Sequence, residues 1–169
     1  MRRNHSFLKF VFLPLAALVV TTADASAQTA TSSFAVTANV VSKCTITSTA
    51  LAFSDYDPLV THAATPLDAN GSVTVRCTKG TNSTIGLDLG LSASGAIRRM
   101  AGGGDFLQYQ LYKEAARTNV WGNSGADLLN PGVSPSMVPR VVTVYGRVFA
   151  GQDVTSGGYN DTILATITF

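Results

Sequence analysis

The chain has 169 residues, a length that fits one domain, and carries a net charge of +2 at pH 7. Only 13% of its residues are charged, and no basic cluster is longer than the pair Arg98–Arg99, which argues against binding to nucleic acid or to an anionic membrane surface. A surface rich in Ser, Thr, Gly and Asn is typical of an extracellular β-protein.

Residues 1–27 have the pattern of a secretory signal peptide. Three basic residues precede the apolar run 10–20, and the small residues 25–27 form a cleavage signal. No second apolar run of about 18 residues follows, so we expect no transmembrane anchor. Removing the signal leaves residues 28–169 with nine basic and nine acidic side chains, which we expect to be exported as one near-neutral domain.

The first strand predicted after the signal peptide covers residues 29–41. Its apolar residues Phe34, Val36, Ala38 and Val40 occupy every second position, which is the period of a half-buried strand. A strand so near a free end is either an ordinary edge strand of its own sheet or the missing strand of another molecule's sheet. Periodicity alone does not decide between these two interpretations.

Cys44 and Cys77 are the two cysteines of the chain. Export places them where thiols are oxidised, so we expect them to form one disulfide. Closing a loop of this length stabilises the fold by roughly 3 to 4 kcal/mol on the chain-entropy estimate. The rival interpretation, a metal or redox site, lacks both further ligands and the CxxC spacing.

The remaining chain predicts further strands separated by short turns. Turn chemistry at Asn70–Gly71 and at residues 102–105 separates some of them, and residues 84–91 alternate so regularly that they form the clearest core strand. About seven strands and no amphipathic helix of normal length predict an all-β sandwich of one domain. The β pattern continues at 44–47, and the later strands are predicted at 72–77, 84–91, 96–100, 106–113, 138–149 and 159–169.

No catalytic constellation emerges from the residues. His62 is the one histidine that remains after signal removal, and without a sequence partner it is expected to be a solvated loop residue. Asp55 and Asp57 precede Pro58 and are expected to cap a turn, and residues 102–104 to form a hairpin turn instead of a phosphate loop. We therefore expect no enzyme activity, no metal site and no cofactor.

Two further features leave alternatives open. The pair Arg98–Arg99 is expected to be solvated or to face a local carboxylate. Trp121, the single tryptophan, either stacks on a sugar or anchors the core, and its large apolar area favours the core.

The order and spacing of several short segments resemble the spore coat protein U domain, a family shared with the Csu-type subunits of archaic chaperone-usher pili. The resemblance covers essentially the whole chain after the signal peptide. Its segments are Cys44-Thr45-Ile46, Phe53-Ser54-Asp55-Tyr56-Asp57-Pro58, Val73 to Thr78, Leu87-Asp88-Leu89-Gly90, Arg99-Met100, Leu107 to Tyr112, Trp121-Gly122, Val144 to Arg147, Gly158 to Thr162 and Ile167-Thr168-Phe169.

The resemblance implies an incomplete immunoglobulin-like β-sandwich that is completed by a donor strand from another subunit. A periplasmic chaperone first fills the gap, and the N-terminal strand of the next subunit then replaces it at an outer-membrane usher. The resemblance places the donor strand in residues 28–38 and the sandwich in residues 39–169. It assigns Phe34, Val36 and Ala38 to the donor strand, and Ile163, Ala165, Ile167 and Phe169 to the acceptor groove.

The function implied by the resemblance is that of a structural subunit of a cell-surface pilus that supports adhesion and biofilm formation. Its partners would be neighbouring pilus subunits, the chaperone and the usher. One alternative is a secreted spore-coat or matrix protein that forms no fibre. The other is a sugar-binding adhesin that uses Trp121 and Tyr112.

Overall fold

The computed structural model describes residues 26–169, and the chain divides into two units with the boundary between Ala38 and Asn39. Residues 26–38 of the first unit form neither helix nor strand, and the side chains of Phe34 and Val36 are 88% and 84% exposed. The strand predicted at 29–41 is therefore not formed by the single chain, because a strand needs a neighbour to bond its backbone groups. Most of the expected signal peptide lies outside the described residues.

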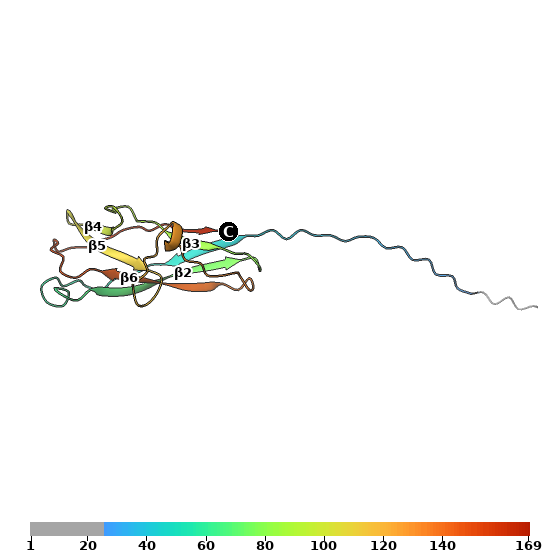
Figure 1. Cartoon of the computed structure of the whole chain (residues 1–169), viewed down its shortest axis with the longest axis horizontal. Helices are drawn as coiled ribbons and strands as arrows, with labels where there is room; N and C mark the ends of the chain where they lie inside the picture. Colours follow the sequence, from blue (N-terminus) through green and yellow to red (C-terminus); the bar gives the residue numbers. More distant parts are fainter. Residues whose placement is uncertain (1–25) are drawn as a thin grey trace, which may run out of the picture. The chain divides into compact units, whose positions relative to one another are not determined.

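The second unit, residues 39–169, contains two antiparallel sheets (Figure 1). The larger sheet has the strand order β1-β2-β6-β5-β4, and the smaller pairs β3 with β7. This architecture confirms the all-β sandwich. The strands are β1 (Cys44–Thr49), β2 (Leu67–Cys77), β3 (Thr84–Leu87), β4 (Arg98–Gly102), β5 (Asp105–Tyr112), β6 (Arg140–Val148) and β7 (Ala165–Thr168), and one 3-10 turn spans Gly125–Asp127.

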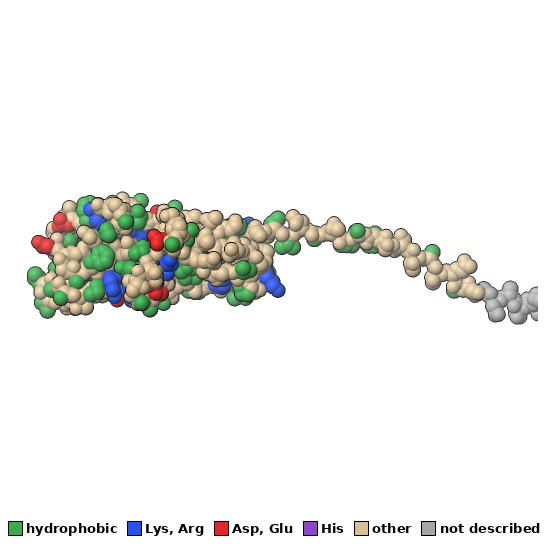
Figure 2. Space-filling view, viewed as in Figure 1, with side chains coloured by type: hydrophobic (Ala, Val, Ile, Leu, Met, Phe, Trp, Pro, Cys, Tyr) green, Lys and Arg blue, Asp and Glu red, His purple; other side chains and the backbone are tan. Residues whose placement is uncertain are grey.

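The core lies between the two sheets and follows the period of two. Leu107, Tyr109 and Leu111 of β5 are buried on one face, as the alternation in this strand predicts. They pack with Ile85 and Leu87 of the smaller sheet, and the cluster is completed by Leu67, Val73, Val75, Trp121, Val144 and Val148. Charged side chains are few and scattered on the face of the molecule shown in Figure 2.

Cys44 and Cys77 form the expected disulfide. The two residues are also opposite each other in the ladder between β1 and β2, so the bond lies at the first pair of that ladder. β1 is thereby fixed to β2 both by hydrogen bonds and by a covalent link.

The turn predicted at Asn70–Gly71 is wrong, because both residues lie inside β2 and pair with Tyr145 and Val144 of β6. The glycine serves close packing instead of a turn. A β-carbon added at Gly71 would be 2.9 Å from the β-carbon of Leu51, so this position allows the chain after β1 to cross close to the sheet.

The strand predicted at 84–91 is too long, because β3 ends at Leu87 and Leu91 is 82% exposed. The side chain of Asp88 accepts a hydrogen bond from the N–H of Gly90 at 3.0 Å, and Gly90 has a φ of +79°. A local turn therefore replaces the strand, because an Asp side chain that accepts the N–H two residues later favours a turn, and Gly90 takes the left-handed conformation that this turn uses.

The hairpin turn predicted at residues 102–104 is confirmed. Gly103 and Gly104 have φ values of +60° and +89° between the paired residues Gly102 and Asp105. Two successive positive φ values suit a tight turn that matches the twist of the flanking strands, and glycine accepts them without steric cost. Within residues 26–169, no helix is long and apolar enough to span a membrane.

Candidate functional site

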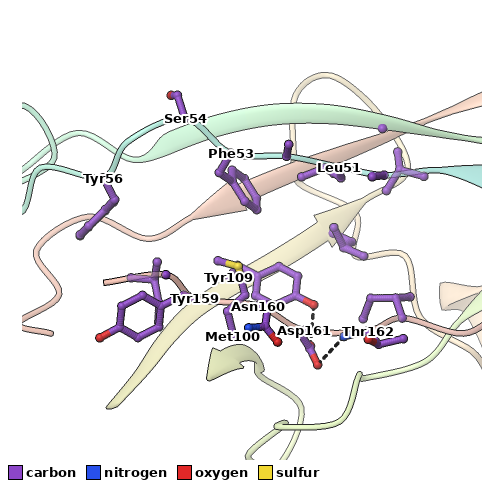
Figure 3. A pocket seen from close by; sticks show the side chains of 18 of the residues that line it. Leu51, Phe53, Ser54, Tyr56, Met100, Tyr109, Tyr159, Asn160, Asp161 and Thr162 are labelled. Atoms are coloured by element: carbon purple, nitrogen blue, oxygen red, sulfur yellow. Dashed lines mark hydrogen bonds between the residues drawn. The ribbon is translucent and has the colours of Figure 1, made fainter. Parts of the chain in front are cut away.

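A groove of about 850 Å³ opens between residues 50–56 on one side and residues 154–165 on the other. Figure 3 shows Leu51, Phe53 and Tyr56 along one wall and Tyr159 to Thr162 along the other, with Tyr109 between them. The groove therefore reaches into the hydrophobic core. Its floor consists of core side chains, namely Val73, Leu87, Leu107, Tyr109, Leu111 and Val144.

The first wall is fixed at Phe53 and at Tyr56. The ring of Phe53 meets Tyr109 edge to face at 6.3 Å between centroids. The hydroxyl of Tyr56 donates to the carbonyl of Phe149 at 3.0 Å and accepts from the N–H of Gln152 at 3.0 Å. These contacts hold the wall against β5 and against the segment that follows β6.

His62 lies beside this wall, and its predicted solvation is wrong. The imidazole is buried, stacks on the ring of Tyr56 at 5.2 Å between centroids, and has Nδ1 at 3.0 Å from the carbonyl oxygen of Thr65. The sequence suggested no partner because both contacts come from the folded loop. Asp57 caps this loop as predicted, accepting the N–H groups of Leu59 and Val60, and these bonds lower its pKa.

The second wall has a two-residue period in its backbone contacts. Asn160 pairs with Ala101, and the carbonyl of Leu164 accepts the N–H of Asp88 at 3.1 Å. In β3, the N–H groups of Ile85 and Leu87 point away from β7, to the carbonyls of Leu129 and Gly122. The ladder between β3 and β7 therefore uses the backbone groups of the even-numbered residues of β7, and the backbone groups of its odd-numbered residues point away from β3.

The backbone groups that face the groove are unpaired within the described part of the chain. Ile163 has no backbone hydrogen bond to any of residues 26–169, and the same is true of residues 50–55 on the opposite wall. Two strand-like edges thus flank an apolar floor. An extended chain that enters between them would bond to both edges and bury its side chains on the floor.

Of the four residues expected to form an acceptor groove, two line the groove and two lie outside its lining. Ile163 and Ala165 line the groove. Ile167 is opposite Ile85 and packs against the core outside the lining, and Phe169 is 55% exposed. Phe34, Val36 and Ala38, expected to form a donor strand, are exposed in the first unit.

Several lining residues were not identified from the sequence as groove residues, among them Leu51, Phe53, Tyr56, Met100 and Asp161. Leu51 and Phe53 alternate with exposed residues, so period-two reasoning applied after β1 would have found them. Asp161 gave no such signal, because its role depends on contacts with residues distant in sequence.

Arg98, expected either to be solvated or to face a local carboxylate, is buried and bonds to the carbonyl of Leu87 in the groove floor. The guanidinium is fully buried and donates to the carbonyls of Leu87, Asp88 and Trp121 at 2.8 to 2.9 Å and to the side-chain oxygen of Gln110. Burial lowers the pKa of Arg98, and burial together with the bond to Asp161 raises the pKa of Tyr109. The fork of five N–H donors suits this set of fixed acceptors.

Trp121 is fully buried, and its indole N–H donates to the carbonyl of Ile85 at 2.9 Å. This confirms the core interpretation of Trp121. Tyr112 is also buried, so the two aromatic side chains considered for sugar stacking present no open ring to a ligand.

The family model described as Spore Coat Protein U domain matches residues 30–166. Protein U of Myxococcus xanthus is 43% identical over 169 residues, covering 91% of this chain and 93% of that protein.

The fold is similar to a chain in the solved CsuC-CsuE chaperone-tip adhesion subunit pre-assembly complex from archaic chaperone-usher Csu pili of Acinetobacter baumannii. The TM-score is 0.57 at 23% identity, over 77% of this chain and 40% of that one. This chain therefore spans well under half of the solved chain. The likeness confirms an immunoglobulin-like sandwich of the type found in pilus subunits.

Proposed function

Because the chain belongs to the Spore Coat Protein U domain family, we propose that it is a structural subunit of a cell-surface pilus, assembled by the chaperone-usher pathway. In this proposal residues 39–169 form the acceptor sandwich, and residues 28–38 form the donor strand of the next subunit. The protein has a structural and not a catalytic role.

The observation that carries this proposal is the shape and chemistry of the groove. Its floor is apolar, and each wall, at Leu51–Phe53 and at Ile163, offers unpaired backbone groups. A small molecule or sugar would satisfy few of these groups, whereas an added β-strand satisfies both rows at once. The groove therefore fits a polypeptide strand better than any other occupant.

The N-terminal unit supplies a strand of the right chemistry. The side chains of Phe34 and Val36 are more than four-fifths exposed. Together with Ala38 they occupy every second position, so in an extended strand all three would lie on one face, with Ala35 and Thr37 on the other. Burying a Phe or Val side chain is worth about 1.5 to 3 kcal/mol. A donor strand from a second copy would thus gain several kcal/mol from side chains that water otherwise covers.

The partners and location follow from the same proposal. A chaperone would occupy the groove in the periplasm before assembly, as the chaperone-tip adhesion subunit complex named above supports. An outer-membrane usher would then exchange the chaperone strand for the donor strand of the next subunit. The finished fibre would lie at the cell surface, where it supports adhesion and biofilm formation.

Polymerisation tests the proposal directly. The native protein is expected to form ladders that resist SDS, because each donor strand is buried in its neighbour. Deleting residues 28–38 should abolish the ladders while leaving a domain that still accepts a strand. A matched pair of double variants sharpens the test: Phe34→Asp with Val36→Asp should block ladders, whereas Ala35→Asp with Thr37→Asp should block them less. Fibres formed by the deletion variant would contradict the proposal.

A secreted coat or matrix protein without fibre assembly is the second candidate, and the description of the matched family favours it. This candidate predicts monomers or amorphous material in the same SDS experiment. Neighbouring genes for a chaperone and an usher would favour the pilus, and their absence would favour the coat protein.

A further inference from the structure

Asp88 extends the pairing of β3 with the second wall of the groove beyond the end of the strand. Its N–H donates to the carbonyl of Leu164 at 3.1 Å, and its Oδ1 accepts the N–H of Leu164 at 2.9 Å. A side-chain oxygen thus replaces the backbone carbonyl that a continued ladder would have used.

Asp161 makes the reciprocal connection from the wall back to the loop after β3. Its Oδ1 accepts the N–H of Leu91 at 2.8 Å and the N–H of Thr162 at 2.9 Å. Its Oδ2 accepts the hydroxyl of Tyr109 from the groove floor at 2.7 Å, and both of its contacts within the groove are drawn in Figure 3. The two carboxylates therefore bind the wall to the loop in both directions, and we call them the Asp88–Asp161 clasp.

We propose that the Asp88–Asp161 clasp holds the second wall in strand geometry before a donor strand arrives, so that Asp88 and Asp161 are positioning residues for strand capture. This inference rests on the proposed function. It assigns a role to the carboxylates in two short segments of the sequence, Leu87 to Gly90 and Gly158 to Thr162.

The wall needs such a device because it has a partner on one side only. An edge segment with unpaired groups frays easily, and a frayed edge must be ordered again before it can accept a strand. The clasp uses bonds on the β3 side of Leu164 and leaves the backbone of Ile163 free toward the groove. It therefore orders the wall without occupying the groups that the donor would use.

Gly90 provides a way to disturb the clasp from a position outside the groove lining. A β-carbon at Gly90 would be 2.0 Å from Oδ2 of Asp161, so the Gly90→Ala side chain displaces the carboxylate. Gly90 itself does not line the groove. Gly80 is a matched control, because its φ of +85° is close to the +79° of Gly90 and no atom lies within 4 Å of an added β-carbon.

The first test is amide hydrogen exchange in the monomeric protein without added ligand. Gly90→Ala should speed exchange about tenfold at the N–H groups of Leu164 and Asn160, neither of which bonds to Asp161. Gly80→Ala should leave these two amides unchanged, although both variants carry the same backbone strain. Asp161→Asn should show an intermediate effect, because the amide oxygen still accepts the N–H of Leu91.

The second test is capture of a fluorescent synthetic peptide with the sequence of residues 29–41. If a tenth of the molecules keep an ordered wall, the association rate falls about tenfold for Gly90→Ala relative to Gly80→Ala. Equal exchange at Leu164 and Asn160 in both glycine variants, or equal association rates, would overturn the inference. A native protein that takes up no peptide would contradict the proposed function, and the exchange data would still decide whether the clasp orders the wall.

Discussion

The side chain of Leu51 lies directly against the backbone of Gly146, so that a β-carbon at Gly146 would be 2.7 Å from Cδ1 of Leu51 and 2.9 Å from Cζ of Phe53. Gly146 belongs to β6, in the middle of the larger sheet, where a side chain is normally expected. Because Gly146 has no side chain, Leu51 and Phe53 of the first wall pack directly against the backbone of β6. The position of the wall therefore depends on a residue that contributes no side chain.

Gly146→Ala should push Leu51 and Phe53 away from the sheet. Forcing a methyl group into a filled site costs about 1 to 3 kcal/mol, so we expect the free energy of unfolding in urea to fall by that amount. Gly158→Ala is the control, because an added β-carbon there meets no atom within 4 Å. Equal free energies of unfolding for the two variants would contradict this prediction, because they would show that Leu51 and Phe53 can move aside at no cost.

Cys44→Ser should destabilise the domain by about 4 kcal/mol, because the disulfide closes a loop between residues 33 apart in sequence. The expected signs are a lower urea midpoint and a lower periplasmic yield. The native protein, unfolded in urea in the presence of a reducing agent, should have the same urea midpoint as the variant. An unchanged midpoint after reduction would mean that the bridge adds nothing to stability.

Arg98→Lys should destabilise the domain by about 2 to 4 kcal/mol, since one ammonium group cannot reach the four acceptors that the guanidinium bonds. Arg99 is the matched control. Its Nε donates to the carbonyl of Ser92 at 2.8 Å and its guanidinium stacks on the ring of Phe106, but it is only partly buried. Arg99→Lys should cost less than about 1 kcal/mol in the same urea titration.

Acidification should loosen the loop at residues 114–119. The N–H of Asn119 and the hydroxyl and N–H of Thr118 donate to Oε1 of Glu114 and lower its pKa from 4.5 to about 2. A carboxyl whose pKa is lower in the folded protein stabilises the loop above its unfolded pKa and loses that effect as the pH falls from about 4.5 to 2. The NMR shifts of the Thr118 and Asn119 amides should follow this titration, and Glu114→Gln should remove it.

The alternation of apolar residues predicted the sandwich and its core face well. In β5 it identified Leu107, Tyr109 and Leu111 as buried, because side-chain direction in a strand depends only on the local period. The same local reasoning failed at Asn70–Gly71, where glycine serves the close approach of Leu51 instead of a turn. A local pattern cannot distinguish these two uses of glycine.

The groove was harder to predict than the fold, because its walls and floor come from segments that are distant in sequence and lie together only in the folded domain. Ile163 and Ala165 were assigned to the groove through the family resemblance, whereas Leu51 and Phe53, which line the facing wall, were overlooked. His62 was expected to be solvated because the sequence offers it no partner, and Arg98 was expected to be solvated or to face a local carboxylate. Their partners, the carbonyls of Leu87 and Thr65 among others, come together only in the folded domain.

The disulfide at the start of β1 also determines how the domain responds to force. A pull on the residues before Cys44 reaches β1 at its first residue and would peel the strand from β2 one pair at a time, beginning with Cys44 and Cys77. That first pair is covalent, so tension passes directly into β2, the strand held on its other edge by β6. The force that this end of the domain withstands is thus set by the covalent disulfide and not by the weak hydrogen bonds at the first residue pair of the β1–β2 ladder.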